Sequence, residues 1–224
     1  MFSRTEILIG QNIQKLHNAK IIVFGIGGVG GYATEMLTRA GIQNITLVDF
    51  DVVSISNKNR QIIALDSTTG KLKTNVMRDR ILDYNPSCNI NVINKKLTPE
   101  NIDSFDLEKY DYVVDCVDMV SSKVALIEYA KLKNIPIISA MGAGNRIGIP
   151  SLKVCDIYKT YNDGLAKVLR KLLKEKGIKS HNVVFCENTT ISNTSGTIGS
   201  ISYYPAMMGC MLSAFVIDDL IKGE

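Results

Sequence analysis

The sequence predicts an α/β protein with a Rossmann-like, doubly wound, mainly parallel sheet, followed by a C-terminal extension that faces the substrate. Short apolar runs rich in β-branched residues alternate with segments of helical spacing from residue 20 to about residue 140. A glycine-rich turn joins the first such run to the first helix. Beyond Gly142 the alternation stops, so we expect one domain with a nucleotide-binding core (1–145) and an extension (146–224).

Five strands and three helices account for the predicted core. The strands are the apolar runs at 20–24, 44–48, 90–93, 110–116 and 135–140, whose continuous apolar character is typical of buried parallel strands. The helices are expected at 29–40, from Lys71 or Lys73 to Tyr84, and at 121–133. Gly41 and the Asn85-Pro86 pair supply stop signals for the first two.

The composition limits the cellular compartment and the class of protein that we expect for this chain. Its 224 residues, 46% hydrophobic, suffice for a full core, and its longest apolar run, 205–217, is shorter than the roughly 20 residues of a membrane span. The five cysteines are widely spaced and include no Cys-x-x-Cys pair, which argues against a disulfide framework and a paired-cysteine zinc site. We therefore expect a cytoplasmic protein without a membrane partner. Cys186 could be a nucleophile or a buried structural thiol, and both histidines are expected at the surface.

The glycine-rich turn predicts a phosphate-binding loop. Gly25, Gly27, Gly28 and Gly30 lie between the first strand and the first helix, where the backbone must approach phosphates and the helix N-terminus offers free N–H groups. Asp49 ends the second strand, near the offset at which an acid meets ribose hydroxyls. For this pattern alone, the usual default is dinucleotide binding and hydride transfer, and the alternative is that the glycines serve only helix–strand packing.

The residues after Asp49 favour ATP over a dinucleotide. An acid, two amides and an arginine follow within a polar segment, and a lysine opens the next helix: Asp51, Asn57, Gln61, Arg60 and Lys73. Two cations around a triphosphate suit displacement at the α-phosphorus, because negative charge builds on the pyrophosphate leaving group. A hydride donor has no such need.

Asp118 follows the fourth predicted strand, at the sheet edge where doubly wound folds bind ligands. Its carboxylate could hold Mg²⁺ together with phosphate oxygens and waters. It could also cap the helix that begins near Ser121, and the two roles are compatible.

Together these motifs resemble the ubiquitin-activating-type adenylyltransferases, the group of the ThiF, MoeB and HesA proteins. The resemblance implies ATP contacts by Asp49, Asn57, Arg60, Gln61 and Lys73. It places Asp118 at magnesium and makes Arg60, Lys73, Asp118 and Arg4 the catalytic set. Because the family's N-terminal arginine reaches into the neighbouring subunit's ATP site, it also implies a homodimer.

Within this group the sequence is most similar to the tRNA threonylcarbamoyladenosine dehydratases, in residues 4–10, 60–67, 141–146 and 156–160. That branch implies ATP-dependent cyclisation of a tRNA base through an acyl-adenylate, with tRNA as partner and with possible sulfur-transfer protein partners. Met119, Ile149-Pro150 and Asp163-Gly164 depart from the expected pattern and leave the substrate details open. The alternatives are an enzyme that adenylates the C-terminal glycine of a sulfur-carrier protein, an NAD-dependent oxidoreductase and a non-catalytic scaffold.

A basic stripe predicts where tRNA binds. Lys167, Arg170, Lys171 and Lys174 fall at i, i+3, i+4 and i+7 of a helical segment, 165–179, whose leucines and Val168 supply an apolar side. A one-sign stripe in a chain of net charge +4 suits phosphate-backbone contacts. The alternative is a solvated amphipathic helix without a nucleic-acid partner.

Overall fold

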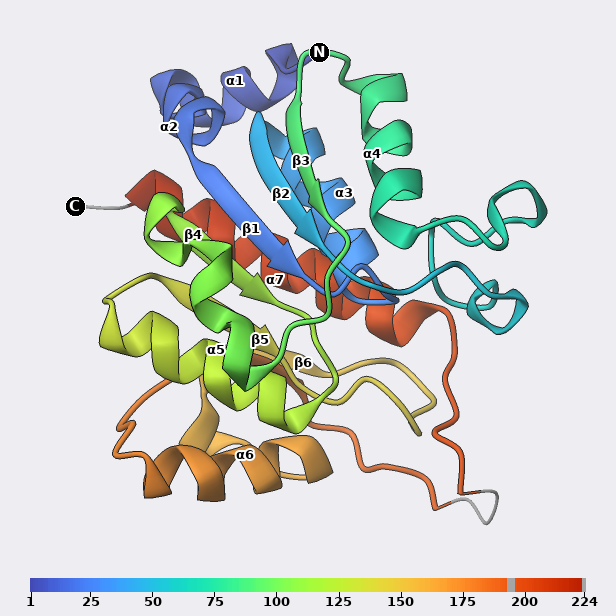
Figure 1. The fold of residues 1–224 in the computed structure, drawn as a ribbon, viewed down its shortest axis with the longest axis vertical. Coiled ribbons are helices and arrows are strands. Elements are labelled where there is room, and N and C mark those ends of the chain that lie inside the picture. Colours follow the sequence, from blue (N-terminus) through green and yellow to red (C-terminus); the bar gives the residue numbers. More distant parts are fainter. Residues whose placement is uncertain (193–195, 223–224) are drawn as a thin grey trace.

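A seven-stranded sheet forms the centre of the molecule, in a computed structural model that describes residues 1–192 and 196–222. The strand order is β3-β2-β1-β4-β5-β7-β6, and every neighbouring pair is parallel except β6 and β7 (Figure 1). The strands are β1 (Lys20–Phe24), β2 (Asn44–Val48), β3 (Asn89–Ile93), β4 (Tyr112–Asp115), β5 (Ile137–Ala140), β6 (Leu152–Asp156) and β7 (Asn182–Cys186). The predicted Rossmann-like α/β class is confirmed.

Helices cover both faces of this sheet. They are α1 (Ser3–Ile9), α2 (Ile13–Asn18), α3 (Gly30–Ala40), α4 (Lys73–Tyr84), α5 (Val120–Leu132), α6 (Gly164–Glu175) and α7 (Tyr203–Lys222). Short 3-10 turns, η1 to η6, occupy Gly10–Asn12, Ile55–Asn57, Asp66–Thr68, Pro99–Phe105, Leu107–Lys109 and Ile157–Lys159. Successive side chains of β1 point to opposite faces of the sheet, and each face has its own hydrophobic core. Ile21 and Val23 pack with α2, α3, α4 and α7, whereas Ile22 and Phe24 pack with α5 and α6.

The C-terminal extension continues the same sheet, through two strands that the sequence analysis did not predict. β7 pairs with β5, and β6 adds an antiparallel edge. α7 then crosses behind the sheet (Figure 1) against α3. Gly209 permits this contact, because a Cβ there would lie 2.4 Å from the carbonyl oxygen of Val29. The extension therefore shares its core with the first 145 residues.

α7 is longer than the apolar run at 205–217 suggested. Its 20 residues make it the one helix in the described chain that is long and apolar enough to cross a membrane, judged by length and composition. Met208, Leu212 and Val216 are nevertheless fully buried against the sheet. One side of α7 is thus a core element of this fold.

The expectation of surface histidines is wrong for His181, which is 1% exposed. It precedes β7, a strand absent from the prediction, so the sequence offered no sign that its neighbours are buried. His17 is half-buried, with its ring 5.3 Å from that of Phe2.

Candidate functional site

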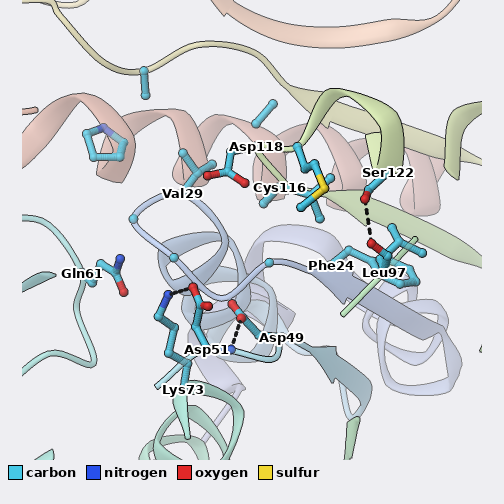
Figure 2. Close-up of a pocket in the computed structure, with 18 of the residues that line it drawn as sticks. Phe24, Val29, Asp49, Asp51, Gln61, Lys73, Leu97, Cys116, Asp118 and Ser122 are labelled. Atoms are coloured by element: carbon cyan, nitrogen blue, oxygen red, sulfur yellow. Dashed lines mark hydrogen bonds and ion pairs between the residues drawn. The ribbon is translucent and has the colours of Figure 1, made fainter. Parts of the chain in front are cut away.

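A cavity of about 580 Å³ lies at the carboxyl ends of β1, β2, β4 and β5, the edge at which open α/β sheets bind ligands. Its size suits a mononucleotide with part of a second substrate. Ten predicted site residues line it: Gly25, Gly27, Gly28, Asp49, Asp51, Asn57, Arg60, Gln61, Lys73 and Asp118. Figure 2 shows Asp49, Asp51, Gln61, Lys73 and Asp118 around the loop that carries Val29.

The glycine loop needs glycine for steric reasons. Gly25 has a φ of +86°, and a Cβ there would lie 2.7 Å from the carbonyl oxygen of Cys116. At Gly30 a Cβ would lie 1.7 Å from the carbonyl oxygen of Gly25. Gly30 was predicted to contact the nucleotide, but it does not line the cavity, so its part in the loop is close packing.

Asp49 holds this loop in place. Its carboxylate accepts hydrogen bonds from the backbone N–H of Ile26 at 2.7 Å and of Asp51 at 2.9 Å. The side chain still lines the cavity, and a carboxylate has further lone pairs for ribose hydroxyls. Asp49 therefore supports the loop and keeps lone pairs free for the ribose contact expected from the sequence.

Two cations, Lys73 and Arg60, line the cavity. Lys73 is 6% exposed, and its ammonium lies 2.7 Å from the half-exposed carboxylate of Asp51 (Figure 2). The Arg60 guanidinium donates to the carbonyl oxygen of Ser56 and to the side chain of Asn59, both at 2.9 Å. Each cation is thus held by groups that leave donors available to an anionic ligand.

Gln61 has a buried side-chain oxygen that could accept a hydrogen bond from a ligand. The residue is 7% exposed and lines the cavity, yet its Oε1 has no hydrogen-bond partner within the described ranges. A buried acceptor without a partner is costly, and a hydroxyl or amine donor from a bound molecule would satisfy it. Neighbouring Asn57 is buried and accepts from the backbone N–H of Ser54, which orders this segment.

Asp118 follows β4 and lines the cavity with an exposed side chain. It has no hydrogen-bond or ion-pair partner in the part of the chain that the structure describes. The alternative role as a helix cap is not found, because α5 begins after Met119 without a side-chain cap. No group of three or more acidic, His or Cys residues that could hold a metal occurs among residues 1–192 and 196–222. One free carboxylate beside a phosphate loop nevertheless fits Mg²⁺, which prefers one or two carboxylates plus phosphates and waters.

A buried ion pair supports the far wall, which consists of residues 141–144. Arg146, 4% exposed, donates to the carbonyl oxygen of Asn162 at 2.9 Å and lies 3.4 Å from the carboxylate of Asp163. That carboxylate also accepts from the N–H of Gly142 and, as the N-cap of α6, from the N–H of Ala166, both at 2.9 Å. The wall and the start of α6 therefore share one carboxylate.

Asp163-Gly164, where the related sequences are expected to have Asp-Pro, is compatible with the start of α6. Gly164 is the first residue of α6, a position at which proline is also tolerated because its N–H is not needed. A Cβ at Gly164 would meet nothing within 4 Å.

Arg4 lies apart from this cavity. It is exposed on α1, makes no hydrogen bond or ion pair with the described residues, and is absent from the cavity lining of its own chain. Next to it on α1, Ile7 and Leu8 are 82% and 84% exposed.

The basic stripe of α6 is narrower than predicted. Lys167, Lys171 and Lys174, the α6 lysines, are exposed, but Arg170 is half-buried and donates to the carbonyl oxygen of Thr160 at 2.9 Å. Val168 was expected on the apolar side and is 46% exposed instead. The expected helix also ends earlier, at Glu175.

Other cavity residues were missed. Lys95 and Lys96 follow β3 and are exposed, and the Lys96 ammonium lies 5.4 Å from the centroid of the Phe50 ring. Their position after a strand next to β2 was a usable signal. Ile198 and Ser200 also line the cavity, but they arrive from a distant segment without regular pattern.

Neither Cys186 nor Cys116 has the features of a reactive thiol. Cys186 is fully buried, its thiol lies 3.0 Å from the side chain oxygen of Asn188, and it does not line the cavity. Cys116 does line the cavity, but burial raises its pKa well above the usual value, which disfavours the reactive thiolate.

Comparison with known proteins identifies the family of this chain. Residues 3–222 match the model of the ThiF family. The tRNA threonylcarbamoyladenosine dehydratase of Bacillus subtilis (strain 168) is 36% identical to it over 99% of this chain and 94% of that protein. The chain belongs to the ThiF family, in the branch of the tRNA threonylcarbamoyladenosine dehydratases.

Solved structures agree with this assignment to the ThiF family. The crystal structure of E. coli tRNA N6-threonylcarbamoyladenosine dehydratase, TcdA, in complex with AMP has a TM-score of 0.93 and 35% identity, covering 98% of this chain and 93% of that one. The complex of the same enzyme with ATP has a TM-score of 0.92. The molybdopterin-synthase adenylyltransferase of Salmonella typhimurium (strain LT2) is 35% identical, but over 62% of this chain and 56% of that protein.

Proposed function

We propose that this chain uses ATP to dehydrate, and so cyclise, threonylcarbamoyladenosine in tRNA. The observation that carries the proposal is the cavity, in which a glycine loop, two cations and a free carboxylate meet at the ligand edge of the sheet. The likeness to dehydratases over nearly the whole chain supports the same reading. We also propose that residues 1–224 form one adenylating domain.

The first step is adenylation. The threonyl carboxylate attacks the α-phosphorus of ATP, an O–P bond forms, and the bond to the β-phosphate oxygen breaks to release pyrophosphate. Arg60 and Lys73 face the cavity on the loop side, so we assign them the negative charge that develops on the leaving group. Gly27 and Gly28 bring the backbone close to the phosphates, with Asp49, Asp51, Asn57 and Gln61 completing the nucleotide contacts.

The second step is ring closure. A nucleophilic atom of the same threonylcarbamoyl group attacks the acyl carbon, and AMP leaves with the carboxylate oxygen, so that the net loss is one water. Because nucleophile and electrophile belong to one modified base, the effective molarity is high. The protein has to position the two ends of one substrate and keep water away from the acyl-adenylate.

Asp118 is the residue that we propose holds Mg²⁺. When bound there, the ion would neutralise charge on phosphate oxygens of ATP. The support for this role is the exposed carboxylate, which no described residue engages and which stands at the cavity.

We further propose a cytoplasmic homodimer in which Arg4 completes the partner's site. Arg4 is exposed and does not line the cavity of its own chain, and Ile7 and Leu8 beside it offer an exposed apolar surface on α1. The five cysteines, all free thiols, suit a reducing compartment. A sulfur-transfer partner stays a proposal from the family resemblance alone.

The α6 lysines are the proposed contact for the tRNA backbone. α6 begins beside the cavity, since Leu165 lines it and Asp163 caps the helix next to Gly142. Lysines along the exposed face would therefore hold an RNA stem whose loop reaches the cavity. Arg170, engaged with Thr160, is assigned to packing and leaves the proposed contact set.

Nucleoside mass spectrometry tests the function. Purified protein is incubated with Mg-ATP and tRNA that carries threonylcarbamoyladenosine, and the cyclic, dehydrated nucleoside is expected together with AMP and pyrophosphate. Omission of ATP is the control. Absence of the cyclic product while the protein exchanges pyrophosphate with a sulfur-carrier protein would favour the alternative activity.

The α6 lysines are tested by changing all three to Gln. We expect weaker tRNA binding and a salt slope smaller by about 2 to 3 units, because each lost phosphate contact lowers the slope by about 0.7 to 0.9. A matched variant removes the same charge at the other end of the sheet, from Lys15, Lys20 and Lys109. Equal slopes in the two variants would assign the helix to the solvated alternative.

A further inference from the structure

A chain of four buried polar side chains lies beneath the cavity. The Lys123 ammonium of α5 lies 2.7 Å from Oδ2 of Asp115, the last residue of β4. Ser139 of β5 donates to the same oxygen at 2.6 Å, and Nε2 of His181 lies 2.8 Å from the Ser139 hydroxyl. All four residues are at most 1% exposed. We call this set the buried chain.

The proton positions in the buried chain follow from its geometry. Ser139 gives its one hydroxyl proton to Asp115, so its oxygen accepts from Nε2–H of His181. Nδ1 of His181 then carries no proton, and it has no partner within the described part of the chain. Asp115 accepts hydrogen bonds from Lys123, from Ser139 and from the backbone N–H of Val117.

The buried chain is connected directly to the candidate site. Oδ1 of Asp115 accepts from the N–H of Val117 at 3.1 Å, which fixes the turn that leaves β4. Cys116, Val117, Asp118 and Met119 all line the cavity. At the other end of this turn, the N–H of Lys123 bonds to the carbonyl oxygen of Met119 at 3.0 Å. One ion pair therefore ties both ends of the segment that presents Asp118.

A contribution to folding stability does not explain why this ion pair is buried. Burying two charges removes them from water, and an apolar pair of similar volume often stabilises a fold as well or better. A carboxylate with three donors, however, defines the direction of the following peptide far more narrowly than apolar packing. The buried chain is thus better explained by geometry at the site.

We infer that Lys123 and Asp115 are positioning residues, which hold segment 116–119 so that Asp118 faces the phosphates. They act through Asp118 and touch neither ATP nor the tRNA base. Ser139 and His181 support the same carboxylate from β5 and from the residue before β7. The inference rests on the proposed function for the role of Asp118.

The test replaces the ion pair with an apolar pair, Asp115→Val with Lys123→Met. We expect a folded protein with a melting temperature close to that of wild type, a kcat lower by about 30- to 100-fold and a higher Mg²⁺ concentration for half activation, since small misplacements near the chemistry cost about 100-fold. The single variant Lys123→Arg keeps the charge beside an intact Asp115 and should retain most of the wild-type kcat. Tyr84→Phe is the matched control, because it removes a part-buried hydrogen bond to Thr38 between α3 and α4, away from the cavity.

Amide hydrogen exchange gives a readout that does not depend on turnover. The Val117 amide should exchange at least about 10-fold faster in the apolar-pair variant and at the wild-type rate in Lys123→Arg and in the control. If the apolar pair does not fold, Ser139→Ala, which removes one donor, should show smaller changes in kcat and in Val117 exchange. Wild-type kcat together with wild-type Val117 exchange in a folded variant overturns the inference. A wild-type protein without turnover would contradict the proposed function, while the exchange experiment would still decide the role of the ion pair.

Discussion

Stability of this protein should fall as the pH drops below neutrality, and His181 should be the main cause. Burial, followed by the nearby cations Lys131 and Lys123, lowers the pKa of His181 from 6.5 to about 3. Its backbone N–H donates to Asp156, and its ring meets Asp115 only through Ser139. Among the described residues, no carboxylate therefore contacts the ring to favour the imidazolium form.

The sign and size of this effect follow from proton linkage. Between pH 6.5 and about 3, the unfolded chain binds a proton at His181 that the folded chain does not, so the free energy of unfolding decreases as pH falls. From about pH 7.5 to about pH 5, the two pKa values give a loss of roughly 2 kcal/mol from this residue. That is a large part of the stability of a typical domain.

Urea denaturation at several pH values measures this loss. His181→Gln keeps a hydrogen-bond donor near Ser139 without a titrating ring, so its free energy of unfolding should depend on pH less steeply than that of wild type, by roughly 2 kcal/mol over the same range. His17→Gln serves as the control for the loss of a histidine elsewhere in the chain. The comparison uses slopes, so a lower absolute stability of the variant does not matter. Identical slopes for wild type and His181→Gln would refute the reasoning.

Three further predictions concern the site. Lys73→Met should lower formation of the cyclic nucleoside by about 100-fold, as expected for loss of one charged group at a phosphoryl transfer, whereas Lys71→Met, exposed and outside the cavity lining, should not. Mixing Arg4→Ala protein with Lys73→Met protein should recover part of the activity that each variant has lost, because one site of a mixed dimer would be complete; no recovery after verified subunit exchange would exclude action in trans. Gly30→Ala should abolish ATP binding or folding, because its Cβ would overlap the carbonyl of Gly25, whereas Gly164→Ala should leave ATP binding unchanged in calorimetry.

The sequence predicted those parts of the fold whose residues follow local rules. β1 and β2 have the expected bounds, and α4 begins at Lys73 and ends before Asn85-Pro86 as expected. β4 is shorter than predicted because Tyr110 belongs to the preceding turn, in which its N–H bonds to the carbonyl of Leu107. β7 was missed because its place in the sheet depends on pairing with β5, far away in the sequence, and β6 was missed because it pairs with β7.

The same distinction applies to the site. Glycine spacing and the cations after Asp49 were visible because a short segment brings them to one edge of the sheet. Arg170 lies at the border of the stripe, because the helical period also aligns it with Ala166 and Leu173 on the buried face. This second alignment did not enter the prediction, and the bond to Thr160 holds the side chain on the inner side. The buried chain was also hidden, because Lys123, Ser139 and His181 meet only through the tertiary fold.

Asp163 has a consequence for how this protein can change over evolution. One carboxylate caps α6 and also holds Gly142 in the cavity wall, so the first turn of the helix is constrained by the chemistry. The α6 lysines lie farther along the exposed face and make no contact with that wall. With the proposed role of the α6 lysines in RNA binding, affinity for different RNAs would diverge through the outer face of α6, whereas substitutions at Asp163 would alter RNA docking and turnover together.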